Sequence, residues 1–140
     1  MFRRNFEGIG TGEPNKLTPS DEMFDFLEKT LRRPLPTEMW LQVWELFAIQ
    51  AINLMFPHRI IKLASSEPFL APLPVECKLS VATSSFQALR LAFQYQESLK
   101  KIEETIEIAS RLYSKWSKKC LYLSIENASA RVAVQVLNEA

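Results

Sequence analysis

The sequence predicts an all-α protein: a helical bundle with one long C-terminal helix. The three glycines of the 140-residue chain all lie in the stretch EGIGTGEP, at residues 7–14, and residues 75–140 contain neither glycine nor proline. Tight β-hairpins favour Gly or Asn at positive φ, and phosphate-binding turns need glycine where the backbone approaches the ligand. Apolar residues also recur at helical spacing through most of the chain after residue 18. These observations favour helices joined by proline-containing connectors.

Length and composition are those of one ordinary globular domain. Hydrophobic residues make up 47% of the chain and charged residues 24%, as in typical soluble domains. A chain of this length can bury a sizeable core without disulfides or metal. We expect residues 1–17 to form a flexible N-terminal arm and residues 18–140 to form a single helical domain. The GIGTG segment of the arm misses the spacing of nucleotide-binding motifs, so we interpret it as linker.

Charge and metal-binding side chains exclude several classes of protein. The formal net charge is +1, so the chain lacks the global basic field of a nucleic-acid-binding protein. Cys77 and Cys120 are far apart and His58 is the single histidine, which gives too few soft ligands for a tetrahedral zinc site. We therefore expect no metal and no cofactor. The N-terminus has no apolar run of the secretory type, so we expect a cytoplasmic protein with free thiols.

The first helix is expected to begin near residue 18. Thr18 can cap it, Pro19 suits the first helical position, and Asp21 completes a capping box. Apolar residues form one face of this helix: Met23, Phe24, Phe26, Leu27 and Leu31. The extended connector PLP, residues 34–36, then separates it from the next helix.

The stretch MWLQVWELFAIQAINLMF, residues 39–56, is apolar enough to suggest a membrane span. The polar residues in and beside it gather on one helical face instead: Glu38, Gln42, Glu45, Gln50 and Asn53. A charge such as Glu45 near the centre of a span costs about 2.5–3.5 kcal/mol. The sequence therefore predicts a mostly buried helix of a soluble bundle, capped by Thr37 and ended by Pro57. We expect its bulky aromatic residues in the core: Trp40, Trp44, Phe47 and Phe56.

Residues 57–83 are the least regular part of the sequence. They contain the segments IIKL and KLSVAT between several proline and serine turns, and each segment can be a short strand or a helical turn. A long irregular loop is uncommon unless it is functional, so this segment is the best place for a binding loop. Within it His58 and Arg59 could bind an anion, although a histidine at a helix end more often caps that helix.

Apolar residues follow a heptad repeat from residue 84 to about residue 120. With Leu99 at position a, every a and d position is apolar or aromatic: Ala88, Ala92, Tyr95, Leu99, Ile102, Ile106, Ala109, Tyr113, Trp116, Cys120 and Leu123. This repeat predicts one helix over residues 84–120, packed along its length. The two preceding helices are too short to cover it, so we expect a second copy or another protein to do so. The predicted interface consists of Leu99, Ile102, Ile106, Tyr113 and Trp116.

Beyond residue 120 the sequence becomes apolar on several sides. The additional apolar residues are Leu121, Tyr122, Ile125, Val132 and Val136. We favour a short last helix here, with Asn127 or Ser129 as its cap. The alternative is a strand pair, CLYLSI and ARVAVQVL, because valines alternate in the second segment. A minor β element therefore stays open near residues 75–83 or 120–138.

These features favour a non-catalytic protein–protein interaction module, such as an adaptor, an assembly factor or a small helical subunit, that forms a homodimer. The alternative is a nucleic-acid-binding accessory subunit with a basic helix end: Arg90, Lys100, Lys101, Lys115, Lys118 and Lys119. An enzyme is the third hypothesis, with Asp25, Glu45, His58 and Cys77 as its candidate residues. The spacing of these four residues does not require a site. We expect no catalytic activity and no membrane association.

Overall fold

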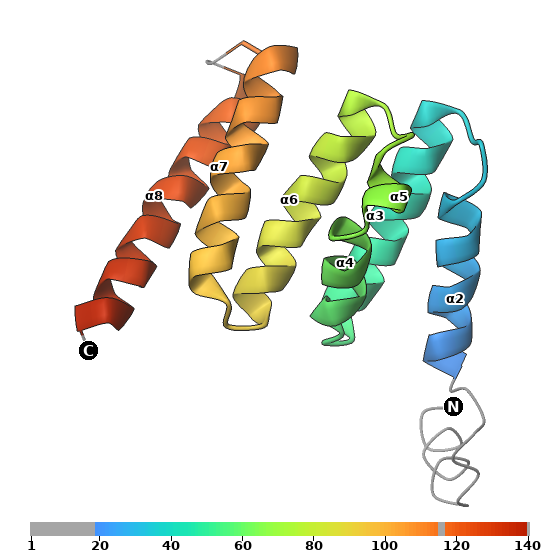
Figure 1. Ribbon diagram of the computed structural model, residues 1–140, viewed down its shortest axis with the longest axis horizontal. Helices are drawn as coiled ribbons and strands as arrows, with labels where there is room; N and C mark the ends of the chain where they lie inside the picture. The colour runs from blue at the N-terminus through green and yellow to red at the C-terminus, as the bar shows by residue number, and fades with distance from the viewer. Residues whose placement is uncertain (1–18, 115–116, 140) are drawn as a thin grey trace, which may run out of the picture.

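The computed structural model describes residues 19–114 and 117–139, and within them the chain is helical with no strand. The helices are α2 Pro19–Leu31, α3 Thr37–Asn53, α4 Pro57–Ala64, α5 Glu67–Leu70, α6 Val75–Leu91, α7 Tyr95–Leu112 and α8 Lys118–Glu139. The long helices lie side by side in a row that runs from α2 through α3, α6 and α7 to α8 (Figure 1). Helix α4 packs against both α3 and α6, with α5 beside it. The all-α prediction is confirmed.

The prediction of one continuous helix over residues 84–120 is wrong. Helix α6 ends at Leu91, and the chain turns back into α7 and again into α8. Phe93 adopts a left-handed conformation with φ of 63°, and the Gln94 N–H donates to the Leu89 carbonyl over 2.8 Å, which closes the end of α6. A long C-terminal helix is present, but it is the 22-residue α8. The heptad pattern continues across the turn between α6 and α7 because each of these helices has an apolar face.

The irregular segment predicted over residues 57–83 is also helical. It contains α4, α5 and the first half of α6. Both candidate β elements, residues 75–83 and 120–138, lie within α6 and α8. Pro57 and Pro68 each occupy the first turn of a short helix, where the missing N–H has no intrahelical partner to lose. Prolines here begin helices rather than interrupt a loop.

The chain contains an internal repeat that becomes visible when α3 and α6 are compared. Each helix has 17 residues, and a proline immediately precedes its first residue. The connectors before them are PLPTE at residues 34–38 and PLPVE at residues 72–76, 38 positions later. Pro36 and Pro74 have similar backbone angles, with φ of −56° and −60°. The two helices therefore start in the same way.

The ends of α3 and α6 repeat as well. Met55 and Phe93, again 38 positions apart, are the non-glycine residues with positive φ in the described part of the chain. The Phe56 N–H donates to the Ala51 carbonyl over 2.7 Å, as the Gln94 N–H does to Leu89. Each helix thus leads through the same turn into an antiparallel partner, α4 or α7. A repeated helical hairpin extends by adding units in one direction, which accounts for the row.

Two clusters of buried side chains lie on either side of α6. The first is rich in aromatic residues and spans α2 to α6: Phe24, Trp40, Trp44, Phe47 and Phe69 belong to it. The second joins α6 to α7 and α8: Leu79, Phe86, Ile102, Ala109, Leu123 and Ala130. Helix α6 contributes Cys77, Val81 and Ala88 to the first cluster, so it is buried on opposite faces. The prediction that Trp40, Trp44 and Phe47 are core residues is confirmed. The same prediction is wrong for Phe56, which lies in the turn after α3 and is 37% exposed.

The polar residues predicted to share one face of α3 lie on its exposed side, together with the exposed Met39, Leu46 and Ile49. Glu38, Gln42, Glu45 and Asn53 are exposed, and Gln50 lies at the edge of that face. Among the helices of residues 19–114 and 117–139, none has both the length and the apolar character needed to cross a bilayer.

Candidate interaction surface

The heptad stripe predicted as a subunit interface is largely used inside the chain. Ile102 is fully buried between α7 and its neighbours. Leu99 and Ile106 pack against the same cluster and are half-buried. Tyr113 is 42% exposed just after α7, and Trp116 lies outside the described residues. The middle of this stripe packs α7 against α6 and α8, so a partner must be sought on other surfaces.

The basic residues predicted for nucleic acid are partly neutralised by nearby carboxylates. Arg90 pairs with Glu126 of α8 and lies over the Phe86 ring. Lys101 pairs with Glu104 over 3.0 Å. Lys100 and Lys118 are exposed and Lys119 is half-buried, whereas Lys115 lies outside the described residues. The charge available to a phosphate backbone is therefore smaller than the sequence alone indicates.

The candidate catalytic residues have other environments. Cys77 is 1% exposed, and burial together with nearby Glu76 raises the pKa of its thiol, which keeps it protonated and unreactive. Glu45 lies on the exposed face of α3. His58 contacts the Phe56 ring edge-on at 5.9 Å between centroids. Within residues 19–114 and 117–139, no three His, Cys, Asp or Glu side chains are grouped so that they could hold a metal ion.

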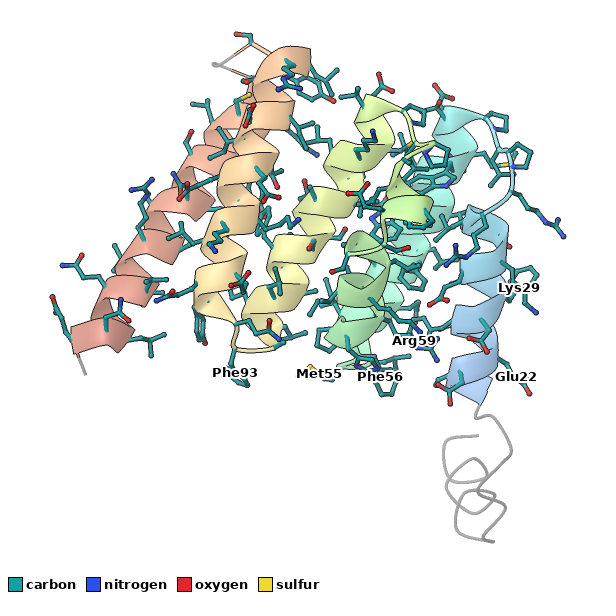
Figure 2. The ribbon with its side chains drawn as sticks, viewed as in Figure 1. Glu22, Lys29, Met55, Phe56, Arg59 and Phe93 are labelled. Carbon is teal, nitrogen blue, oxygen red and sulfur yellow. The ribbon has the colours of Figure 1, made fainter. Side chains whose placement is uncertain are left out.

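Arg59 holds α4 against α2 rather than exposing an anion site (Figure 2). Its guanidinium donates to Asp21 over 2.8 Å and to Asp25 over 3.2 Å, and it lies 3.5 Å from Glu28. It also covers the Phe24 ring at 5.2 Å. Burial lowers the pKa of Arg59, but the hydrogen bonds with Asp25 and Asp21 outweigh it and raise the pKa. The anions that Arg59 binds are carboxylates of its own chain.

A pocket of about 420 Å³ lies between the two repeated connectors. Pro34 and Leu35 of the first connector and the whole second PLP segment line it, and Trp40 and Phe69 are its aromatic lining residues. Arg32 also lines it, and its guanidinium lies 5.6 Å from the centre of the Phe69 ring. The Trp40 indole N–H is satisfied by the Leu31 carbonyl at 2.9 Å. The pocket is thus an apolar hollow with a cationic wall, formed where two repeat units meet.

An apolar edge is formed by the turns after α3 and α6. Met55, Phe56 and Phe93 lie along the same edge of the molecule in Figure 2. All three are exposed, Phe93 most of all at 78%. The repeat places large side chains at both left-handed positions, where glycine would have been easier to accommodate.

Helix α8 lies at the end of the row (Figure 1) and carries an uncovered apolar stripe. Leu121, Ile125, Val132 and Val136 are exposed and lie within about 60° of one another at 100° per helical residue. The buried side of α8 is on the opposite face of the helix and consists of Leu123 and Ala130. We call the four exposed residues the outer stripe of α8. The sequence indicated it through the apolar pattern beyond residue 120, which we interpreted as a mixture of helix and strand signals.

No protein-family model, curated protein or solved structure matches this chain. The pocket and the outer stripe were both missed at the sequence level. The repeated PLP connector was the signal for the pocket, because two copies of one connector in a helical row come to lie near each other.

Proposed function

We propose that this protein is a non-catalytic protein–protein interaction module: an adaptor, an assembly factor or a small helical subunit of a complex. The observation that carries the proposal is the outer stripe of α8. Its members are 43–68% exposed, although aliphatic side chains of this size are normally buried. A contiguous apolar patch on a soluble protein typically marks a site where another molecule binds.

The position of α8 strengthens this proposal. In a row of stacked helices, the end helix needs a polar outer face to stay soluble by itself. Helix α8 has 22 residues, of which Leu123 and Ala130 are buried. Its outer face is the apolar one, so the row is expected to continue into a further surface supplied by a partner.

The proposal includes self-association as a homodimer and a reducing, cytoplasmic compartment. Both cysteines are free thiols, which fits such a compartment. Catalysis is not part of the proposal because no group of polar residues in the described chain motivates a reaction.

Site-specific photo-cross-linking tests this function. A photoreactive amino acid replaces Ile125 in the outer stripe, or Ser124, the exposed neighbouring residue outside it, in cells that naturally make the protein. We expect a discrete protein adduct from position 125 that is absent from position 124. Equal, diffuse labelling at both positions, or adducts with nucleic acid alone, would overturn the proposal.

A further inference from the structure

We propose that α8 pairs with α8 of a second copy of this chain, antiparallel, about a two-fold axis beside Ala128 and Ser129. This inference rests on the proposed function and names its partner. It uses a surface different from the heptad stripe of α7, which is occupied inside the chain.

Contacts within the chain fix which face of α8 is free. Leu123 and Ala130 are buried against the cluster shared with α6 and α7. On either side of them, Glu126 pairs with Arg90 of α6, and Arg131 lies 3.6 Å from Glu103 of α7. The Tyr122 hydroxyl accepts a hydrogen bond from Gln87 at 3.2 Å. These contacts hold the helix so that the outer stripe points away from the row.

The outer stripe is self-complementary. A two-fold axis requires that when residue i contacts residue j of the other copy, j contacts i in return. About the midpoint between Ala128 and Ser129, the equidistant positions match in character: Lys118 with Glu139, Leu121 with Val136, Ile125 with Val132, and Ala128 with Ser129. All of these residues are exposed, and by helical geometry they centre on the same line along α8. The two smallest side chains fall at the axis, where the backbones can approach most closely.

Charge selects the antiparallel orientation. Lys118 and Glu139 are the charged ends of this line, so antiparallel helices place each lysine beside the partner copy's glutamate. Parallel helices would place lysine beside lysine and glutamate beside glutamate, which is unfavourable. Glu139 accepts a 3.3 Å hydrogen bond from Gln135 through one carboxylate oxygen, and the second oxygen can accept from a lysine.

The charged residues at the ends of α8 are placed more favourably in the antiparallel pair than in a single chain. Except for the short α4, the described helices before α8 each have an acidic residue in the first turn, which suits the positive end of the helix dipole. Helix α8 has none there and instead begins with Lys118 and Lys119. In the antiparallel pair, Lys118 approaches the negative C-terminal end of the other α8. The arrangement that is unfavourable within one chain becomes favourable between two.

A membrane surface fits this stripe less well. Helices that bind bilayers carry many Lys and Arg residues on the polar face, whereas α8 balances two lysines and Arg131 against Glu126 and Glu139. One helix per chain makes a small contact, and such contacts form reversible dimers rather than obligate ones. We therefore expect a dimer that dissociates on dilution.

Sedimentation equilibrium of the full chain over a range of micromolar concentrations tests the pairing. We expect a monomer–dimer equilibrium that Ile125→Asp weakens roughly tenfold or more, because the new charge is buried in the interface. Ser124→Asp places the same charge beside the outer stripe and should leave the equilibrium unchanged. Ile125 is 68% exposed in one chain, so helicity measured by circular dichroism should be the same in both variants.

A charge swap tests the orientation without disturbing the apolar contacts. Lys118→Glu or Glu139→Lys alone should weaken the dimer by about threefold to tenfold, and the double variant should restore it. Single variants without effect, or a double variant as weak as either single one, would overturn the antiparallel pairing.

The wild-type chain also separates this inference from the proposed function. A monomer at all concentrations overturns the α8 pair, as does a dimer that Ile125→Asp leaves intact. A monomer whose position 125 still cross-links to a different protein in cells overturns the pair and the homodimer named in the proposed function, but supports the interaction module. A monomer without such an adduct overturns both, and an adduct with a second copy supports both.

Discussion

The two sides of α6 are packed with different kinds of side chain. On the side of α2 and α3, four aromatic rings meet: Phe24 packs edge-on to Phe47, and Trp44 lies between Phe47 and the stacked ring of Trp40. On the side of α7 and α8, Phe86 is the aromatic member of the cluster, and two of the remaining members are alanines. The first side buries large rings and the second mainly aliphatic groups.

This difference implies a gradient of stability along the row. Burial of apolar area is the main favourable term in folding, and helices in a row depend mostly on their immediate neighbours. The aromatic side should therefore unfold last, and α8, held through Leu123 and Ala130 on one face, should unfold first. An interface on α8 would then also stabilise the weakest helix of the chain, because a partner that binds only the folded state adds to its stability.

The largest effect is expected from Phe47→Ala on the aromatic side. Phe47 is fully buried and contacts both Phe24 and Trp44, so the truncation leaves a cavity that these rings cannot fill. We expect the free energy of unfolding to fall by about 3–5 kcal/mol. Chemical denaturation followed by circular dichroism measures this. A loss below that of Leu123→Ala would contradict the gradient.

Leu123→Ala should destabilise only the side of α6 that faces α7 and α8. Leu123 is fully buried between α8 and its neighbours, and its truncation costs about 2–4 kcal/mol locally. Hydrogen exchange, measured by mass spectrometry, should show faster exchange throughout α8 and unchanged protection in α3. Equal acceleration in both helices would mean that the row unfolds as one unit.

Arg59→Met tests the attachment of α2 to the aromatic side. The variant keeps an apolar side chain over the Phe24 ring but removes the charge that Asp21, Asp25 and Glu28 share. Because the Arg59 side chain is 19% exposed, we expect the free energy of unfolding to fall by about 1–2 kcal/mol. Calorimetry or denaturant unfolding measures this change.

Arg111→Met is the matched control for that variant. Arg111 pairs with Glu107 at 2.9 Å, and both side chains are 70% exposed. Exposed pairs of this kind contribute well under about 1 kcal/mol, so this variant should unfold almost like the wild type. A similar loss of stability in both variants would show that the ion pairs of Arg59 contribute no more than an exposed surface pair.

The sequence predicted those features that depend on neighbours along the chain. Helix α3 was predicted from the polar residues that share one of its faces, a pattern contained within one helix. Its predicted ends were less accurate, because Pro36 rather than Thr37 occupies the N-cap position and Pro57 begins α4. The break between α6 and α7 was missed because Phe93, rather than glycine, takes the left-handed position. The heptad register gave no sign of it, since a turn that reverses the chain can leave the apolar spacing unchanged.

The candidate surfaces could not be predicted from the residues of one helix, because they depend on how the helices pack against one another. Ile102 and Ile125 are both isoleucines on apolar faces, yet one is fully buried and the other is 68% exposed. Which face meets a neighbour is decided by the row: α7 has a helix on each side, and α8 lies at the end. The PLP repeat was readable in the sequence, and it is the signal that would have indicated a row of hairpins.

The smallest effect is expected from Phe93→Gly in the turn between α6 and α7. Phe93 has φ of 63° and is 78% exposed, so its ring gains little from packing while its Cβ disfavours the left-handed conformation. We expect a gain of about 0.5–1 kcal/mol in stability, measured by denaturant unfolding. Phe93→Ala removes the ring but keeps the Cβ, and should gain nothing. Met55→Gly should give a similar gain if the two turns are equivalent copies, and a loss there instead would show that Met55 packs in a way that the repeat does not require.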